Sequence, residues 1–121
     1  MSAYRLPDYL DQMQQAASNA CGFVAGLTRQ GFLEDKRTQQ AVVMSLFIIG
    51  EAATKIMDGY ADFARAHGQV LWPHMRGMRN RIAHGYFDID LEVVWETIQS
   101  ALPALLAQLA TVRPDADHES F

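Results

Sequence analysis

Four polar side chains that can bind a phosphate and move a proton lie within eight residues of one another. They are Arg79, Asn80, His84 and Tyr86. An imidazole titrates near neutral pH, so it can act as a general base or a general acid. A guanidinium binds a phosphate through two parallel hydrogen bonds and stabilises the extra charge of its transition state. The set indicates phosphodiester cleavage that needs no metal ion, with His84 and Arg79 as the catalytic candidates.

Asn80, Tyr86 and Glu51 support this interpretation. Asn80 lies four residues before His84, on the same face of a helix, where it can orient the imidazole or donate to a phosphate oxygen. Tyr86 follows Gly85, where we expect the helix to end, so its hydroxyl can reach the same cleft. Glu51 interrupts an apolar run in a different helix. Two roles remain open for it: an ion pair with Lys55 one turn later, or a position beside the cleft.

The spacing of Arg79 and His84 creates a geometric problem. On an ideal helix these two side chains point about 140° apart, and Arg79 lies at the edge of the buried side. One chain does not easily bring both groups onto a single phosphate. A two-fold dimer in which the motif helices face each other places two arginines and two histidines in one cleft. We therefore predict a homodimer.

The elements that carry these residues are all predicted to be helical. Apolar residues recur at helical spacing along the chain, and no alternating strand pattern competes with them. The central helix is apolar nearly all round between residues 41 and 53, which is typical of the most buried helix of a bundle. The predicted helices cover residues 7 to about 30, 35–57, 61–67, 73–84 and 91 onward. The expected fold is an all-α bundle with a short motif-bearing helix packed between longer ones.

Several residues are expected to define the ends and the packing of these helices. Gly31 should end the first helix, and Gly85 should end the motif helix in the left-handed conformation. Asp90 should cap the last helix, and Pro103 should kink it by removing the hydrogen bond to Gln99. The core face of the motif helix is predicted to comprise Leu71, Met75, Met78 and Ile82.

Composition predicts one globular domain over residues 1–112, followed by a polar tail, 113–121, that we expect to be disordered. The chain has 121 residues, of which 50% are hydrophobic and 20% charged. The net charge of -4 is the wrong sign for a protein that coats nucleic acid generally. Between Phe63 and Phe87, however, no acidic residue occurs, while four arginines and three histidines do. Positive charge is therefore concentrated around the motif.

Other classes of function find little support. The single cysteine, Cys21, excludes an internal disulfide and a cysteine-based zinc cluster, and its apolar surroundings predict a buried thiol. The four histidines are scattered, so we expect no metal site and no cofactor. We found no leader or membrane-spanning pattern and expect a cytoplasmic protein with no membrane partner. Arg76 and Arg81 are assigned to a solvated face with no chemical role.

The pattern Arg-x4-His-x-Tyr, formed here by Arg79, His84 and Tyr86, resembles the signature of HEPN-domain ribonucleases. A wider resemblance to the HepT toxins covers most of the chain between Gly31 and Trp95. Its segments are Gly31-Phe32-Leu33-Glu34-Asp35-Lys36-Arg37-Thr38-Gln39, Ile49-Gly50-Glu51-Ala52-Ala53, Trp72-Pro73 and Tyr86-Phe87-Asp88-Ile89-Asp90. The resemblance implies an all-α HEPN bundle that dimerises and cleaves RNA without a metal ion.

The resemblance also implies a regulatory partner. HepT-like toxins pair with MntA, a small nucleotidyltransferase antitoxin that silences them by adding AMP to the motif tyrosine, here Tyr86. The rival interpretation is a non-catalytic HEPN subunit that binds nucleotides and assists a nucleotidyltransferase, using the same arginine and histidine to hold a phosphate. A third is a purely structural helical module, for which the acid-free segment around the motif would be unnecessary.

Overall fold

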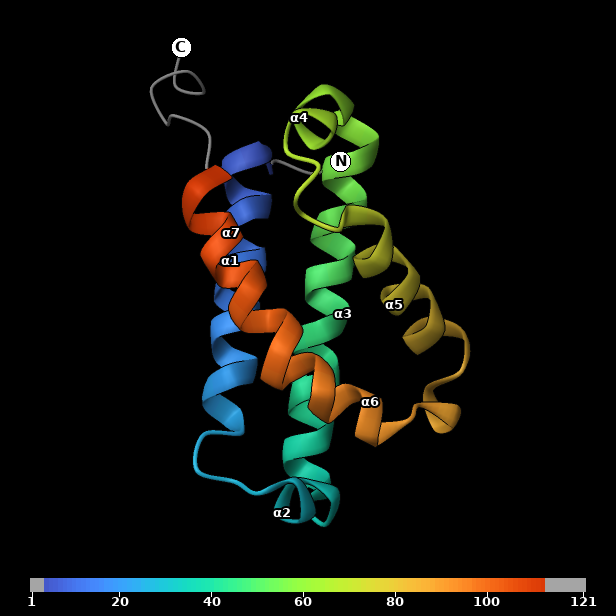
Figure 1. Cartoon of the computed structure of the whole chain (residues 1–121). Helices are drawn as coiled ribbons and strands as arrows, with labels where there is room; N and C mark the ends of the chain where they lie inside the picture. The colour runs from blue at the N-terminus through green and yellow to red at the C-terminus, as the bar shows by residue number, and fades with distance from the viewer. Residues whose placement is uncertain (1–3, 113–121) are drawn as a thin grey trace.

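The computed structural model describes residues 4–112, and the secondary structure of this part is entirely helical, as predicted (Figure 1). The predicted tail, 113–121, lies outside the described residues. The elements in chain order are α1 (Leu6–Phe23), α2 (Arg29–Leu33), α3 (Lys36–Gly59), α4 (Ala61–Ala66), α5 (Trp72–His84), the 3-10 turn η1 (Tyr86–Asp88), α6 (Leu91–Glu96), the π-helical turn η2 (Thr97–Ala101) and α7 (Leu102–Val112).

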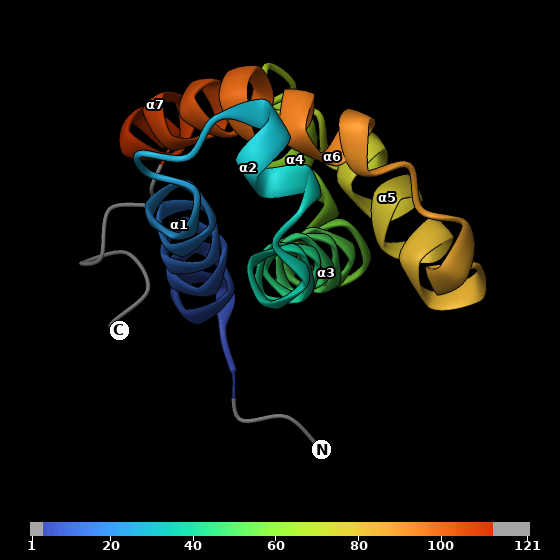
Figure 2. The same cartoon turned by 90° about the horizontal axis from the view of Figure 1, so that it is seen from below.

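The central helix of the bundle is α3. It packs against α1 on one side and α5 on the other, while α6 and α7 run across the top of this layer in Figure 2. Its apolar residues Val42, Leu46, Ile49, Ala53 and Ile56 are fully buried or nearly so. By length and composition alone α3 could cross a membrane, but half of its most apolar window is buried inside the protein. A central core helix is expected to have this composition.

The first connection differs from the prediction. Helix α1 ends at Phe23, and the turn is made by Gly26, whose φ of 83° lies in the left-handed region that favours glycine. Gly31 does not end α1; it lies inside the short helix α2, where its N–H donates to the Thr28 hydroxyl. The neighbouring Phe32 is fully buried against Trp95, so the connection packs under the core as expected.

Two aspartates cap the helices that flank the motif. Asp35 caps α3 by accepting hydrogen bonds from the N–H and the hydroxyl of Thr38, and these bonds lower the pKa of its carboxyl. Asp90 caps α6 by accepting from the N–H groups of Glu92 and Val93, which confirms the prediction. The start of α3 and the start of α6, on either side of the motif, are therefore defined by local hydrogen bonds.

Two details of α5 differ from the prediction, and one feature of the last helix agrees with it. Gly85 follows α5 with a φ of -151°, which is negative and not left-handed, because the chain continues into η1 through a bond from the Asp88 N–H to the Gly85 carbonyl. Leu71 is exposed because it precedes the first turn of α5, although Met75 is buried. The irregularity predicted at Pro103 is present as the wide π turn η2 immediately before it, which interrupts the last helix and accommodates the missing hydrogen bond.

Helices α3 and α5 come unusually close at Gly50. A Cβ atom at this position would lie 2.3 Å from Cβ of Arg79 and 2.6 Å from the Met75 carbonyl oxygen. The carbonyl belongs to the backbone of α5 and cannot turn aside, so only glycine permits this approach. The missing side chain of Gly50 brings the backbone at Arg79 directly against α3.

We expect Gly50→Ala to destabilise the protein by about 1–3 kcal/mol, because the added methyl group overpacks the α3–α5 contact. Urea unfolding followed by circular dichroism measures this change. Gly77→Ala in α5 is the matched control, since its Cβ would meet only Arg81 Nη1 at 3.6 Å. Alanine should stabilise that helical position by roughly 0.5–1 kcal/mol. Equal unfolding midpoints for Gly50→Ala and the unmodified protein would show that the helices are not this close.

Candidate active site

Arg79 lies on the face of α5 that meets α3, at the edge of the buried side as predicted. Its Nη2 donates to the Thr54 hydroxyl at 3.0 Å, and its Nε lies 3.0 Å from Oε1 of Glu51. This Nε is buried, and its N–H does not point along the line to the carboxylate, so the contact is an ion pair without a well-aligned hydrogen bond. The guanidinium is thus oriented by α3 while 24% of its side chain remains exposed.

Glu51 takes the second of its two possible positions, beside Arg79. Its side chain is 45% exposed, and no ion pair among residues 4–112 joins it to Lys55. A half-exposed ion pair contributes little to stability, so orientation is its main effect. Because the carboxylate occupies part of the guanidinium's surroundings, a phosphate approaching Arg79 must share the cation with Glu51 or displace it.

Two residues of α3 that were not predicted from the sequence hold this face of α5. The Thr54 hydroxyl accepts from Arg79 and donates to the Gly50 carbonyl at 2.8 Å, and Asp58 forms an ion pair with Arg76. The assignment of Arg76 to a solvated face was therefore wrong, since its guanidinium is bound to α3. The spacing of Glu51, Thr54 and Asp58, which places all three on one side of a largely apolar helix, was the signal available in the sequence.

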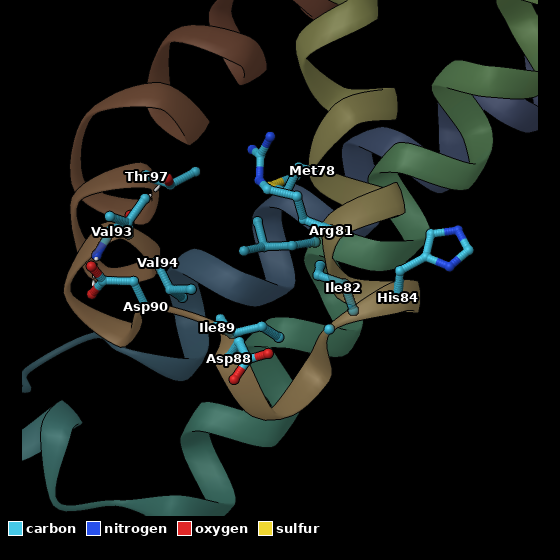
Figure 3. Close-up of a pocket in the computed structure, with 12 residues that line it drawn as sticks. Met78, Arg81, Ile82, His84, Asp88, Ile89, Asp90, Val93, Val94 and Thr97 are labelled. Carbon is cyan, nitrogen blue, oxygen red and sulfur yellow. Dashed lines mark hydrogen bonds between the residues drawn. The ribbon is translucent and has the colours of Figure 1, made fainter.

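His84 lies in the last turn of α5 and is exposed, as is Asn80 one turn earlier. No hydrogen bond of the described residues joins these two side chains, so the orienting role predicted for Asn80 is not formed in this conformation. Figure 3 shows the His84 imidazole directed away from the groove between α5 and α6. The cavity that His84 lines and the depression that Tyr86 lines do not have Arg79 among their lining residues. Arg79 therefore contacts α3, whereas the His84 side chain is exposed at the end of α5.

Tyr86 lies in η1, on the same side of the molecule as α3. Its ring lines a shallow apolar depression together with Ile82 and the α3 residues Val43, Met44 and Phe47. The ring is 44% exposed and packs edge-on against Phe87, whose side chain is 96% exposed. The motif therefore ends in an uncovered aromatic surface.

Other candidate chemistry is sparse in this part of the chain. The described residues contain no group of three or more His, Cys, Asp or Glu side chains that could hold a metal ion. Cys21 is half-buried in α1, somewhat less than predicted, and burial raises the pKa of its thiol. It packs at the edge of the core and does not contribute to the site.

The residues of this site lie in a segment that matches a known protein family. The model of the family described as "Ribonuclease HepT-like" matches residues 13–112, which include Glu51, Arg79, Asn80, His84 and Tyr86. The chain belongs to this family. The HepT-like family is of the HEPN kind, so the resemblance drawn from the motif is confirmed. No solved structure matches the chain.

Several curated relatives cover nearly the whole HepT-like chain. A protein of Thermococcus cleftensis named probable ribonuclease HepT is 36% identical over 106 residues, which are 88% of this chain and 94% of that protein. A putative RNase of Methanocaldococcus jannaschii is 32% identical over 94% of this chain and 88% of its own length. A putative RNase of Caldanaerobacter subterraneus is also 32% identical, over 86% of this chain and 90% of its own length.

Proposed function

We propose that this protein is an endoribonuclease that cleaves RNA without a metal ion, with Arg79 and His84 as its catalytic residues. The observation that carries the proposal is the guanidinium of Arg79, which α3 holds in a fixed orientation close to the surface. A cation fixed by neighbouring groups can stabilise a charged transition state without reorganising during the reaction. Membership of the ribonuclease HepT-like family and the names of the relatives support the same activity.

In the proposed reaction, His84 removes the proton of an RNA 2′-hydroxyl, and the resulting oxygen attacks the adjacent phosphorus. A new P–O bond forms to this oxygen, the bond to the 5′-oxygen breaks, and the leaving oxygen takes a proton from an imidazolium. The products are a 2′,3′-cyclic phosphate and a 5′-hydroxyl. Arg79 binds the non-bridging phosphate oxygens and balances their growing negative charge.

We further propose that the working form is a homodimer joined at the motif end of the molecule. The surface there consists of Phe87, Tyr86 and Met44, with exposed fractions of 96%, 44% and 57%. Exposed aromatic groups gathered beside a site favour an interface, because covering them removes apolar area from water. A second copy on this surface would bring His84 of the partner subunit toward Arg79 and complete a cleft that one chain leaves divided.

Cleavage of RNA in the presence of EDTA is the first test of this function. We expect the purified protein to cut RNA at the same rate with and without the chelator, because an imidazole performs the proton transfers. Product ends identified by mass spectrometry should carry cyclic phosphate. Activity that disappears with EDTA and returns with magnesium would contradict the metal-free reaction. Nucleotide binding without any cleavage would instead favour the accessory-subunit interpretation.

We also propose that the protein is the toxin of a toxin–antitoxin pair and acts in the cytoplasm. In this proposal a MntA-type nucleotidyltransferase silences it by adding AMP to Tyr86. The partly exposed ring of Tyr86 supports this choice, because its hydroxyl is close to solvent at the end of the motif helix. The added phosphate would compete with RNA for Arg79. Incubation with the cognate transferase and ATP should therefore stop cleavage and add the mass of AMP to the peptide containing Tyr86.

Tyr86→Phe tests this regulation directly. The variant keeps the ring that packs beside Phe87 but has no hydroxyl to accept AMP. We expect it to remain active and to escape inhibition by the transferase, as measured by RNA cleavage before and after incubation. If the transferase still silences the phenylalanine variant, or if the added mass lies on another peptide, Tyr86 is not the point of control.

A further inference from the structure

A groove between α5 and the chain from η1 to η2 has His84 at its edge, but its other lining residues have no part in the proposed reaction. Helix α5 packs mainly on α3, and its opposite side faces a cavity of about 490 Å³ (Figure 3). A second cavity of about 300 Å³ adjoins it along α7 and shares Met78, Arg81 and Thr97 with it. The first cavity is within the size range of small-ligand sites in proteins.

The walls of this groove are apolar, and the guanidinium of Arg81 lies between them. Leu46, Met78, Ile82 and Val94 form the walls, and Figure 3 shows the Arg81 side chain rising between α5 and η2. Arg76 and Arg79 are both bound to α3, whereas Arg81 has no ion pair or hydrogen bond with any of residues 4–112. An arginine on an apolar wall without a carboxylate partner is available to bind an anion.

The end of the groove nearest η1 has the opposite charge. Asp88 and Asp90 line it, and Asp90 already accepts two backbone hydrogen bonds as the cap of α6. The Asp88 carboxylate accepts no hydrogen bond from the described part of the chain, and it lies beside Gly85 at the end of the motif helix. A free carboxylate there can accept a hydrogen bond from an exocyclic amino group, as acidic side chains do from cytosine.

We infer that this groove binds one nucleotide of the RNA next to the cleaved bond. Arg81 holds its phosphate, the apolar walls cover the faces of its base, and Asp88 accepts from an amino group on the base edge. The inference rests on the proposed function, since it assigns part of the same RNA strand. In this arrangement Arg81 and Asp88 determine which nucleotide binds. Cytosine should bind better than uracil, because uracil presents a carbonyl oxygen in place of the amino group.

Nuclear magnetic resonance of ¹³C-methyl methionine tests the groove without any need for cleavage. Met78 lines the groove, Met44 marks the surface beside Tyr86, and the fully buried Met13 is the internal reference. On titration with CMP we expect the Met78 signal to shift and the Met13 signal to stay. UMP should bind roughly tenfold more weakly, because uracil has no amino group to donate a hydrogen bond to Asp88. A shift of Met44 without Met78 would place the nucleotide at the dimer surface and overturn the inference.

Two exposed substitutions separate the assigned roles. Arg81→Gln should weaken both CMP and UMP about tenfold, and in cleavage assays it should raise KM while leaving kcat nearly unchanged. Asp88→Asn should remove the preference for CMP. Arg65→Gln is the control, because Arg65 forms an ion pair with Asp62 on α4. If Arg81→Gln binds CMP with unchanged affinity, the inference is wrong. It is also wrong if CMP does not shift the Met78 signal, which is the result expected if a helix of a partner protein fills the groove. Binding at Met78 by a protein that cuts no RNA would refute the ribonuclease proposal alone.

Discussion

Replacing His84 with alanine is expected to slow RNA cleavage by about 10²–10⁴-fold, the usual contribution of a general acid or base. The side chain is exposed in the last turn of α5, so its removal opens no cavity in the core. Circular dichroism and the thermal unfolding midpoint should therefore match those of the unmodified protein. The rate is measured on a short labelled RNA at saturating concentration, which reports kcat and separates chemistry from binding.

A matched control distinguishes catalysis from a general effect of losing a histidine. His67 follows α4 and stacks on Phe63 with ring centroids 4.5 Å apart, away from the motif. His67→Ala should cleave RNA at nearly the rate of the unmodified protein. If His84→Ala retains full activity, the imidazole does not transfer the proton, and the proposed reaction is wrong even if the protein remains a ribonuclease.

Mixing two inactive variants should restore cleavage if the site is shared between subunits. Arg79→Ala is expected to lose about 10²–10³-fold in rate, the effect of removing one donor that stabilises a transition state. Arg79→Ala and His84→Ala homodimers each lack one half of every site. A mixed dimer has one site in which both residues are intact and one in which both are missing. Random exchange of subunits should then recover about a quarter of the original activity.

The geometry of this chain is the reason to expect recovery. Arg79 is bound to Glu51 and Thr54 on the α3 side, while His84 points elsewhere from the end of the same helix. The two variants are refolded together, mixed dimers are isolated by two different affinity tags, and their cleavage rate is compared with that of each parent. Mixed dimers that form and remain inactive would place both residues of a working site in one protomer. A monomer that is fully active would remove the need for a dimer altogether.

The sequence was sufficient to predict α3, α4 and α5 with nearly correct ends and the start of the last helix, but it missed the short helix α2 and extended α1 too far. A run that is apolar on all sides identified α3 as the central helix, and Asp90 was identified as a cap from its position before an apolar periodic stretch. Both features depend on residues that are close in the chain. The angular separation of Arg79 and His84 was predictable for the same reason, since it follows from the helical repeat alone.

The contacts between helices could not be predicted in this way. Helical periodicity tells which side of a helix is buried, but not which residue of another helix faces it or how close the two axes come. The ion pair of Arg76 with Asp58, the bond from Arg79 to Thr54 and the close approach at Gly50 all depend on how α3 and α5 are aligned. The conformation of Gly85 was missed because the η1 turn that follows it determines its φ angle.

The one-sided packing of α5 has a consequence for how enzymes of this shape can diverge. The side of α5 against α3 is constrained, because Gly50 leaves no room for change and Arg79 is bound there. The opposite side carries the exposed Arg81 and faces an open groove, and exposed substitutions usually change stability by less than about 0.5 kcal/mol. Mutations can therefore accumulate along the groove and alter which RNA is preferred, while the residues that cut it keep their places.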